Sequence, residues 1–263
     1  LGALRELERR VVALALALVV AVSWLYILAG AGMGMPALEM SFAPWAAEGG
    51  AMAMGAMPAM AWTPGYAVLI FFMWWVMMIA MMLPSAAPMI LLYARIDRQQ
   101  GGGRLVSTGV FAGAYLLAWA AFSLIAVLGH WGLDRSGLLS SMMASTSAAL
   151  GGGLLLAAGL WQLTPLKQAC LRHCRSPLQF LSRYWRPGQG GALRMGLRHG
   201  AFCLGCCWSL MALLFYGGVM NLYWIVGLAA VVLVEKLLPR GRWFGYLLGA
   251  LLIAWGASLL WSA

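Results

Sequence analysis

Soft metal ligands are concentrated in one stretch of this 263-residue sequence. All five cysteines and two of the three histidines lie between residues 170 and 207: Cys170, His173, Cys174, His199, Cys203, Cys206 and Cys207. If the second half of this stretch is helical, His199, Cys203 and Cys206 share a face about 60° wide. Thiolate and imidazole together suit Cu(I) or Zn(II), and nearby basic residues favour the thiolate form. The alternative is that cysteine packs here as a small apolar residue, which explains one or two cysteines better than five.

Methionine forms a second concentration of soft ligands, because thirteen of the eighteen methionines lie between residues 33 and 89. Within an expected helix, Met73, Met77 and Met81 fall in one stripe about 80° wide. Thioether sulfur selects Cu(I), which makes these three residues candidate ligands. The alternative is packing against neighbouring helices, which the flexible Met side chain does well. Seven further methionines lie in a Gly-, Ala- and Pro-rich segment, where packing explains them less well.

Two prolines, Pro84 and Pro88, lie inside the helix that carries the Met stripe. Each removes one helix hydrogen bond, so we expect a kink or an unwound segment there. Carbonyl groups freed in this way beside a Met cluster are typical of transporter sites. A kink that only shapes the packing of the helices is the alternative.

The composition places these ligands in a membrane. Hydrophobic residues make up 63% of the chain and charged residues only 9%, against about 25% charged residues in soluble domains. A helical span needs roughly 20 apolar residues. We therefore predict an all-α, polytopic transmembrane bundle that forms a single integral membrane domain over residues 1–263, the first of its roughly seven spans being a retained anchor. The predicted spans are 11–29, 66–93, 105–129, 141–163, 197–217, 222–238 and 243–261.

The basic residues predict the orientation of this bundle. With the N-terminus in the cytoplasm, sixteen of the seventeen Lys and Arg residues fall on the cytoplasmic side, and only Arg135 falls outside. We therefore expect a bacterial inner-membrane protein with a periplasmic C-terminus and with anionic lipid at its inner face. The Met-rich segment, about 30–65, is then an outer loop, and the basic Cys/His segment, about 164–196, an inner one. Stable disulfides are not expected in the reducing cytoplasm.

The same sequence excludes several function classes. The net charge of +10 is explained by topology, so we expect no nucleic-acid partner. The chain has no Walker sequence and no Gly-rich phosphate cradle, so it is not by itself an ATP-driven pump. It has no paired carboxylates and no Ser/His/Asp set in a recognisable context, so an enzyme is not favoured and no catalytic residue is predicted.

Few polar residues fall in or beside the predicted spans. Glu235 and Lys236 end the sixth span, where both side chains can reach the interface, and only Glu235 offers a carboxylate for proton coupling. His130 and Asp134 are four residues apart in an outer segment. They form either an i,i+4 pair or, more simply, a solvated cap.

Four blocks of the sequence resemble the signature of a bacterial family of uncharacterised, predicted metal-binding integral membrane proteins. They are residues 73–89, residues 162–167, residues 170–177, and the pattern Gly196-x-x-x-Gly200-x-x-Cys203-x-Gly205-Cys206-Cys207-Trp208-x-Leu210-Met211. The resemblance covers most of the chain from the second span onward. It implies a polytopic inner-membrane protein with a metal site, and it implies no reaction because the family is a domain of unknown function.

Two functions of different classes follow from these patterns. The first is the handling of a soft metal, with copper favoured over zinc, for transport or for delivery to a membrane cuproenzyme. Met residues would capture the metal and the Cys/His cluster would hold it. The second is a non-catalytic subunit or assembly factor of a larger membrane complex, or a homo-oligomer, because the many Gly and Ala residues suit helix packing. A membrane oxidoreductase is a weaker third option, since no haem, flavin or quinone signature is present.

Overall fold

The computed structural model describes residues 2–41, 61–100, 105–140, 143–238 and 241–262. The named elements of this part are all helices, as the sequence predicts. In chain order they are α1 (Gly2–Leu28), α3 (Pro64–Gln99), α4 (Leu105–Arg135), α5 (Ala148–Leu163), α6 (Pro165–Arg175), α7 (Pro177–Tyr184), α8 (Gly188–Ala212), α9 (Leu214–Gly217), α10 (Leu222–Leu237) and α11 (Gly241–Trp261).

Short polar residues fix where several of these helices begin. The Thr63 hydroxyl caps α3 by accepting from the Tyr66 N–H at 3.2 Å, and Thr164 caps α6 in the same way. Proline follows each threonine at the first helical position, where its missing N–H costs nothing. Because Pro165 cannot continue the hydrogen bonding of α5, the chain bends by 66° between α5 and α6. This bend turns α6 toward α8.

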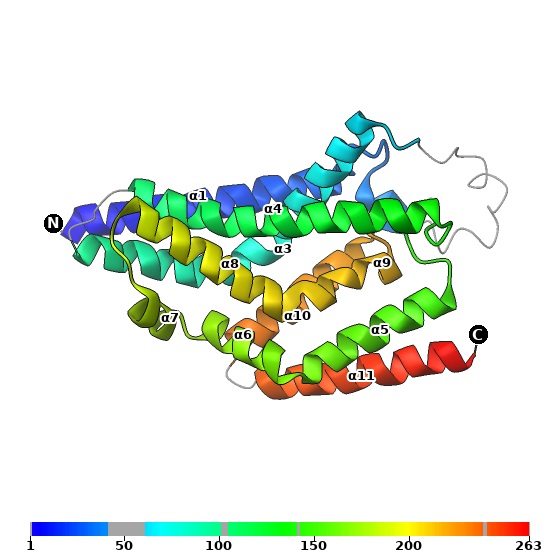
Figure 1. The fold of residues 1–263 in the computed structure, drawn as a ribbon. Coiled ribbons are helices and arrows are strands. Elements are labelled where there is room, and N and C mark those ends of the chain that lie inside the picture. The colour runs from blue at the N-terminus through cyan, green and yellow to red at the C-terminus, as the bar shows by residue number, and fades with distance from the viewer. Residues whose placement is uncertain (1, 42–60, 101–104, 141–142, 239–240, 263) are drawn as a thin grey trace.

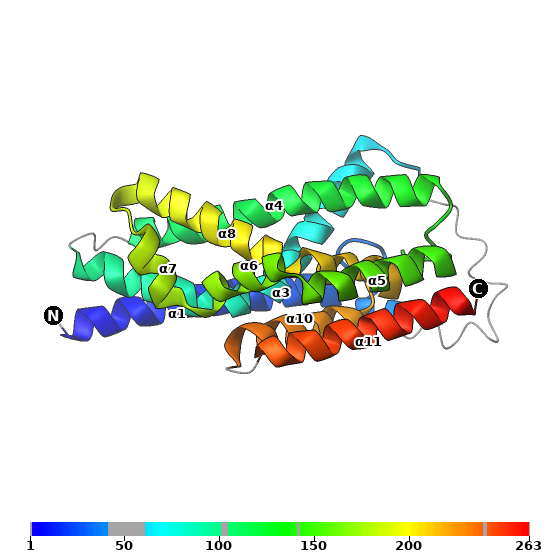
Figure 2. The same ribbon diagram turned by 60° about the horizontal axis from the view of Figure 1, so that its bottom comes forward.

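The helix with the Met stripe is continuous. α3 stays helical through Pro84 and Pro88, so the expected unwound segment is not found. Both ribbon views show α3 bending part-way along its length (Figures 1 and 2), in agreement with the alternative of a kink. A single bent helix of 36 residues therefore carries the Met stripe at one level and, further along, the turn that contains Ser85.

Small residues let two helix pairs approach closely. A Cβ atom on Gly196 of α8 would lie 2.3 Å from the Phe111 carbonyl oxygen of α4, so only glycine fits there. Across the antiparallel pair α5 and α11, which lie side by side in both figures, a Cβ atom on Gly159 would lie 2.8 Å from the Gly249 carbonyl oxygen. Close backbone approach of this kind is the usual way that helices associate in a bilayer.

Five helices in the described part of the chain are long and apolar enough to cross a membrane, or six if the bent pair α5–α6 is one span. They are Leu7–Leu28, Pro64–Gln99, Leu105–Arg135, Gly188–Gly217 and Gly241–Trp261. Every predicted span overlaps a helix, but α5 and α10 have 16 residues each, about 24 Å, against the roughly 30 Å of a bilayer core. The count of seven spans stays a prediction.

The first helix begins and the last helix ends on different sides of the bundle. The start of α1 and the end of α11 lie at opposite ends of the molecule in both views. Figure 1 shows α7, the start of α8, the end of α3 and the start of α4 on the same side as the start of α1, and several basic residues fall in these segments. Which side faces the cytoplasm stays a prediction.

The Met-rich segment is described only in part. Met33 and Met35 are half-buried and Met40 is buried, whereas Met52, Met54, Met57 and Met60 lie outside the described residues. The predicted inner segment is largely helical, since it contains α6, α7 and the beginning of α8.

Candidate copper site

Four cysteine side chains meet in the interior of the bundle. Cys203, Cys206 and Cys207 lie on one buried face of α8, each with no exposed surface, and Cys174 on α6 is 9% exposed. We call these four residues the thiol cluster. Figure 1 shows α6, the second half of α8 and the end of α10 coming together in the middle of the molecule. The bend after α5 is what brings Cys174 to α8.

The four thiol groups lie close enough to interact with one another. The Sγ atoms of Cys206 and Cys207 are 3.2 Å apart, and the Cys206 thiol donates to the Cys203 carbonyl oxygen at 3.2 Å. The Cys174 thiol interacts with those of Cys203 and Cys206 across the α6–α8 contact. All five cysteines of the chain, Cys170 included, are free thiols. Cys203 and Cys206, which the sequence predicts to share a helix face with His199, are both buried on α8, as is Cys207.

Cys203 is part of a closed ring of polar contacts. The Lys236 ammonium group at the end of α10 donates to the Cys203 Sγ and to the Ser85 Oγ, at 3.0 Å each. Ser85 in turn donates to the Met82 carbonyl oxygen of α3 at 2.8 Å. The Tyr115 hydroxyl of α4 also donates to that oxygen and lies 3.2 Å from the Cys203 Sγ. Residues of α3, α4 and α10 therefore hold Cys203 of α8 in place. The cation beside the cysteine sulfur favours the thiolate form.

Next to this ring lies a buried ion pair. The Lys167 Nζ of α6 lies 2.7 and 2.8 Å from the two carboxylate oxygens of Glu235 on α10, and the two side chains are 0% and 1% exposed. Lys236 is also buried. The expectation that Glu235 and Lys236 reach the membrane interface is therefore wrong, because each has a polar partner inside the protein.

The remaining Cys and His candidates lie outside this ring. Cys170 is half-buried one turn before Cys174, and its Sγ packs against Gly205 of α8. His173 is bound through Nδ1 to the Ala169 carbonyl oxygen at 2.9 Å, and its ring stacks on Phe202 at 4.0 Å.

His199 lies one turn before Cys203 and is buried. Its ring stacks against Tyr115 with the centroids 5.5 Å apart. Its Nδ1 atom has no hydrogen-bond partner among the described residues. It is therefore a buried imidazole, without a polar partner at Nδ1 in the described part of the chain, one helical turn from the thiol cluster.

The Met candidates are part of the hydrophobic core. Met73 and Met77 have no exposed surface and Met81 has 2%. All three pack within the core cluster of the bundle. In the turn that follows, α3 offers the Met82 carbonyl oxygen to Tyr115 and the Ser85 hydroxyl to Lys236, and these two side chains contact Cys203.

The thiol cluster is not a ready-made metal site. Within the described ranges, no group of three or more His, Cys, Asp or Glu side chains has the geometry of a metal site. The thiols are instead paired with one another and with Lys236. Rotation of the cysteine side chains about χ1 would have to replace these contacts by bonds to a metal.

Comparison with known protein families gives a match that covers most of the chain. Residues 71–259 match the model of the PpoB2 family, which is described as copper chaperone. The chain belongs to the PpoB2 family. No curated protein and no solved structure matches it. The expected involvement of copper is thus supported at the level of the family. The resemblance to a family of uncharacterised membrane proteins stays a prediction.

The PpoB2 match begins within α3 and ends near the end of α11, so it includes the whole thiol cluster and Lys236. It leaves out the Met-rich segment. The donor set at the cluster suits a soft monovalent ion, because it offers thiols and one buried cation but no nearby free carboxylate. A zinc site has no support from the family.

A second polar group of this PpoB2 member lies at the other end of α4. The Trp62 Nε1 donates to the Asp134 carboxylate at 2.6 Å, and the Trp62 ring packs edge-on against the buried His130. The interpretation of His130 and Asp134 as a solvated cap is therefore partly wrong, since the His130 side chain is 2% exposed.

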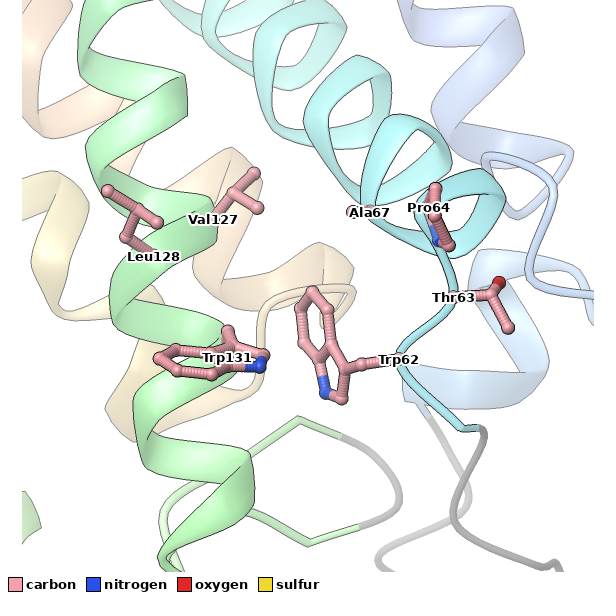
Figure 3. Close-up of a pocket in the computed structure, with 7 residues that line it drawn as sticks. All are labelled: Trp62, Thr63, Pro64, Ala67, Val127, Leu128 and Trp131. Carbon is pink, nitrogen blue, oxygen red and sulfur yellow. The ribbon is translucent and has the colours of Figure 1, made fainter.

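A pocket of about 340 Å³ lies beside this group, between α3 and α4 (Figure 3). Its walls are Trp62, Thr63, Pro64, Ala67, Val127, Leu128 and Trp131, which offer no sulfur and no imidazole.

Sequence reasoning missed Lys167, Tyr115 and Ser85 as neighbours of the site. Lys167 looked like one more basic residue of an inner segment. A signal was present at Glu235 and Lys236, because two adjacent charges in a very apolar segment require partners if the helix is buried. The sequence cannot show which helices supply those partners.

Proposed function

We propose that this protein is a membrane-embedded copper chaperone that binds Cu(I) at the thiol cluster and delivers it to a copper enzyme at the membrane. The observation that carries the proposal is the meeting of Cys174 with Cys203, Cys206 and Cys207 in the interior of a chain that belongs to a copper chaperone family. Delivery, rather than ATP-driven transport, agrees with the absence of a nucleotide-binding motif from the sequence.

The chemistry of the cluster supports Cu(I) as the cargo. Thiolate sulfur is a soft ligand, and Cu(I) accepts few ligands, so two of the four thiols suffice to bind it. A structural zinc site normally uses four ligands in a closed tetrahedron, and the thiols here do not adopt one. Burial of the cluster also keeps water away from bound Cu(I), which protects its oxidation state.

Part of the cluster belongs to the short helix α6, and this supports release as well as binding. α6 is connected to its neighbours by a bend at one end and by a proline-started turn at the other. A movement of α6 away from α8 separates Cys174 from Cys203 and Cys206 without unfolding any long helix. We propose that the recipient enzyme takes copper through such a movement.

The experiment that tests the proposal measures copper in the purified protein. The full chain is prepared in detergent without oxygen, loaded with Cu(I), and freed of unbound metal, and its copper content is measured by mass spectrometry. A variant with Cys174, Cys203, Cys206 and Cys207 changed to Ser is compared with Cys170→Ser, a matched control that removes a thiol outside the cluster. Near-stoichiometric copper in the wild type and the control, and loss of copper in the four-residue variant, supports the proposal.

Three outcomes count against the proposal. Copper retained by the four-residue variant would place the binding site elsewhere. No copper in any variant would remove the basis of the chaperone function. Zinc instead of copper in the wild type would favour a structural site, and with it the alternative of an assembly subunit of a larger complex.

A further inference from the structure

Lys236 is a buried cation whose charge is not balanced by a carboxylate. Among the described residues, the buried acidic side chains are Asp97 and Glu235. Glu235 is already paired with Lys167 through both of its oxygens. Asp97 lies on α3 twelve residues beyond Ser85, which is about 18 Å along the helix axis. The nearest groups that can balance Lys236 are therefore the thiols.

A count of the buried charges shows what the site requires. Lys167 and Glu235 cancel, so Lys236 leaves one positive charge in the interior. An uncompensated buried charge is strongly unfavourable, so the cluster has to supply one negative charge. Cu(I) bound by two thiolates carries a net charge of −1, which balances Lys236. A zinc ion bound by four thiolates carries −2, which one lysine does not balance.

We propose that Lys236 is the fixed counter-ion of the bound copper, and that its charge selects a complex of one Cu(I) with two thiolates. This inference rests on the proposed function. Lys236 is a positioning residue rather than a ligand, because an ammonium group has no lone pair to donate. In the metal-free protein it donates to Cys203, and once copper is bound it neutralises the complex without leaving its place.

The surroundings of Lys236 suit this role. Ser85 accepts one of its hydrogen bonds at 3.0 Å and fixes the ammonium group on the side of α3. Its charge acts on Cys203, Cys206 and Cys207 together, so it serves whichever pair of thiolates binds the metal. The adjacent Lys167–Glu235 pair keeps the carboxylate of Glu235 from neutralising Lys236 in place of the thiolates.

The experiment compares variants that differ in charge at this site. Cu(I) affinity is measured for the full chain in detergent by competition with a coloured Cu(I) chelator. Lys236→Met removes the charge at similar length, and Lys236→Arg keeps it. The double variant Lys167→Met/Glu235→Met is the matched control, because it removes two buried charges from the same helices without changing their sum.

We expect Lys236→Met to weaken Cu(I) binding about 30-fold or more, as the loss of one partner of a buried charge pair does. Lys236→Arg and the double variant should keep affinities within about threefold of the wild type, well inside the tenfold change that 1.4 kcal/mol produces. Equal affinity of Lys236→Met and wild type would overturn the inference while leaving the copper function intact. An equal loss in the double variant would also overturn it, since general disruption would then explain both. A wild type without Cu(I) would overturn the function and the inference together.

Discussion

The Lys167–Glu235 pair joins α6 and α10, two of the helices beside the proposed copper site, so we expect the loss of either partner to be costly. Lys167 belongs to α6, which carries Cys174, and Glu235 belongs to α10, which carries Lys236. Both side chains are buried, with N–O distances of 2.7 and 2.8 Å. Lys167→Met leaves the Glu235 carboxylate buried without a cation, and Glu235→Met leaves the ammonium group without an anion.

The expected magnitude follows from the burial of both charges. Removing one partner of a buried ion pair lowers the free energy of unfolding by about 3–5 kcal/mol, because the other charge remains in a medium of low dielectric constant. Replacing both partners by apolar side chains of similar size is often neutral or stabilising. Each single variant should therefore lower the free energy of unfolding by about 3–5 kcal/mol. The free energy of unfolding of the double variant should lie within about 1 kcal/mol of the wild-type value, far from the sum of the two single losses.

The assay is a double-mutant cycle on the full chain in detergent, with denaturant unfolding followed by tryptophan fluorescence. Because the two side chains are in direct contact, the cycle should give a large interaction energy. Single variants that each cost less than about 1 kcal/mol, as exposed pairs do, would refute the reasoning. A double variant equal to the sum of the singles would refute it as well.

Three further predictions use other parts of the structure. Gly196→Ala should destabilise the protein by about 1–3 kcal/mol, because the new methyl group would meet the Phe111 carbonyl oxygen, whereas Gly190→Ala in the same helix, where nothing lies within 4 Å, should be neutral or stabilising in the same thermal-unfolding measurement. Trp62→Phe should cost about 1.5–3 kcal/mol through the lost hydrogen bond to Asp134, whereas Trp261→Phe, at a side chain 93% exposed, should leave the denaturation midpoint unchanged. Removal of copper by a Cu(I) chelator should lower the thermal midpoint of loaded wild type but not that of the four-Ser variant, since only a protein that binds the ligand is stabilised by it; an equal shift in both would contradict the site.

Local signals in the sequence account for most of the fold. The apolar stretches predict helices that the structure contains, and Thr63-Pro64 and Thr164-Pro165 mark two of their first turns. Hydropathy alone does not predict the lengths of α5 and α10. An apolar stretch marks the middle of each helix, whereas a cap or a turn sets where the helix begins and ends. Thr164-Pro165 marks the place of the bend between α5 and α6, but hydropathy reports neither its angle nor the packing of α6 against α8.

The site was predictable where it lies on one helix and not where helices meet. Periodicity places His199, Cys203 and Cys206 on one face of α8, and all three side chains are buried. Periodicity also groups Met73 with Met77 and Met81, but a stripe alone does not distinguish a ligand from core packing. The contacts of Lys236 with Ser85 and Cys203 span up to 151 residues of sequence, so only the fold shows them.

X-ray absorption at the copper edge of the Cu(I)-loaded protein identifies the atoms bound to the metal. We expect a first coordination shell of sulfur only, with the low coordination number of a Cu(I)–thiolate complex. The shell should be lost when Cys174, Cys203, Cys206 and Cys207 are changed to Ser and kept in Cys170→Ser. A shell of nitrogen or oxygen, or a sulfur shell that persists without the four cysteines, would contradict the thiol cluster as the copper site.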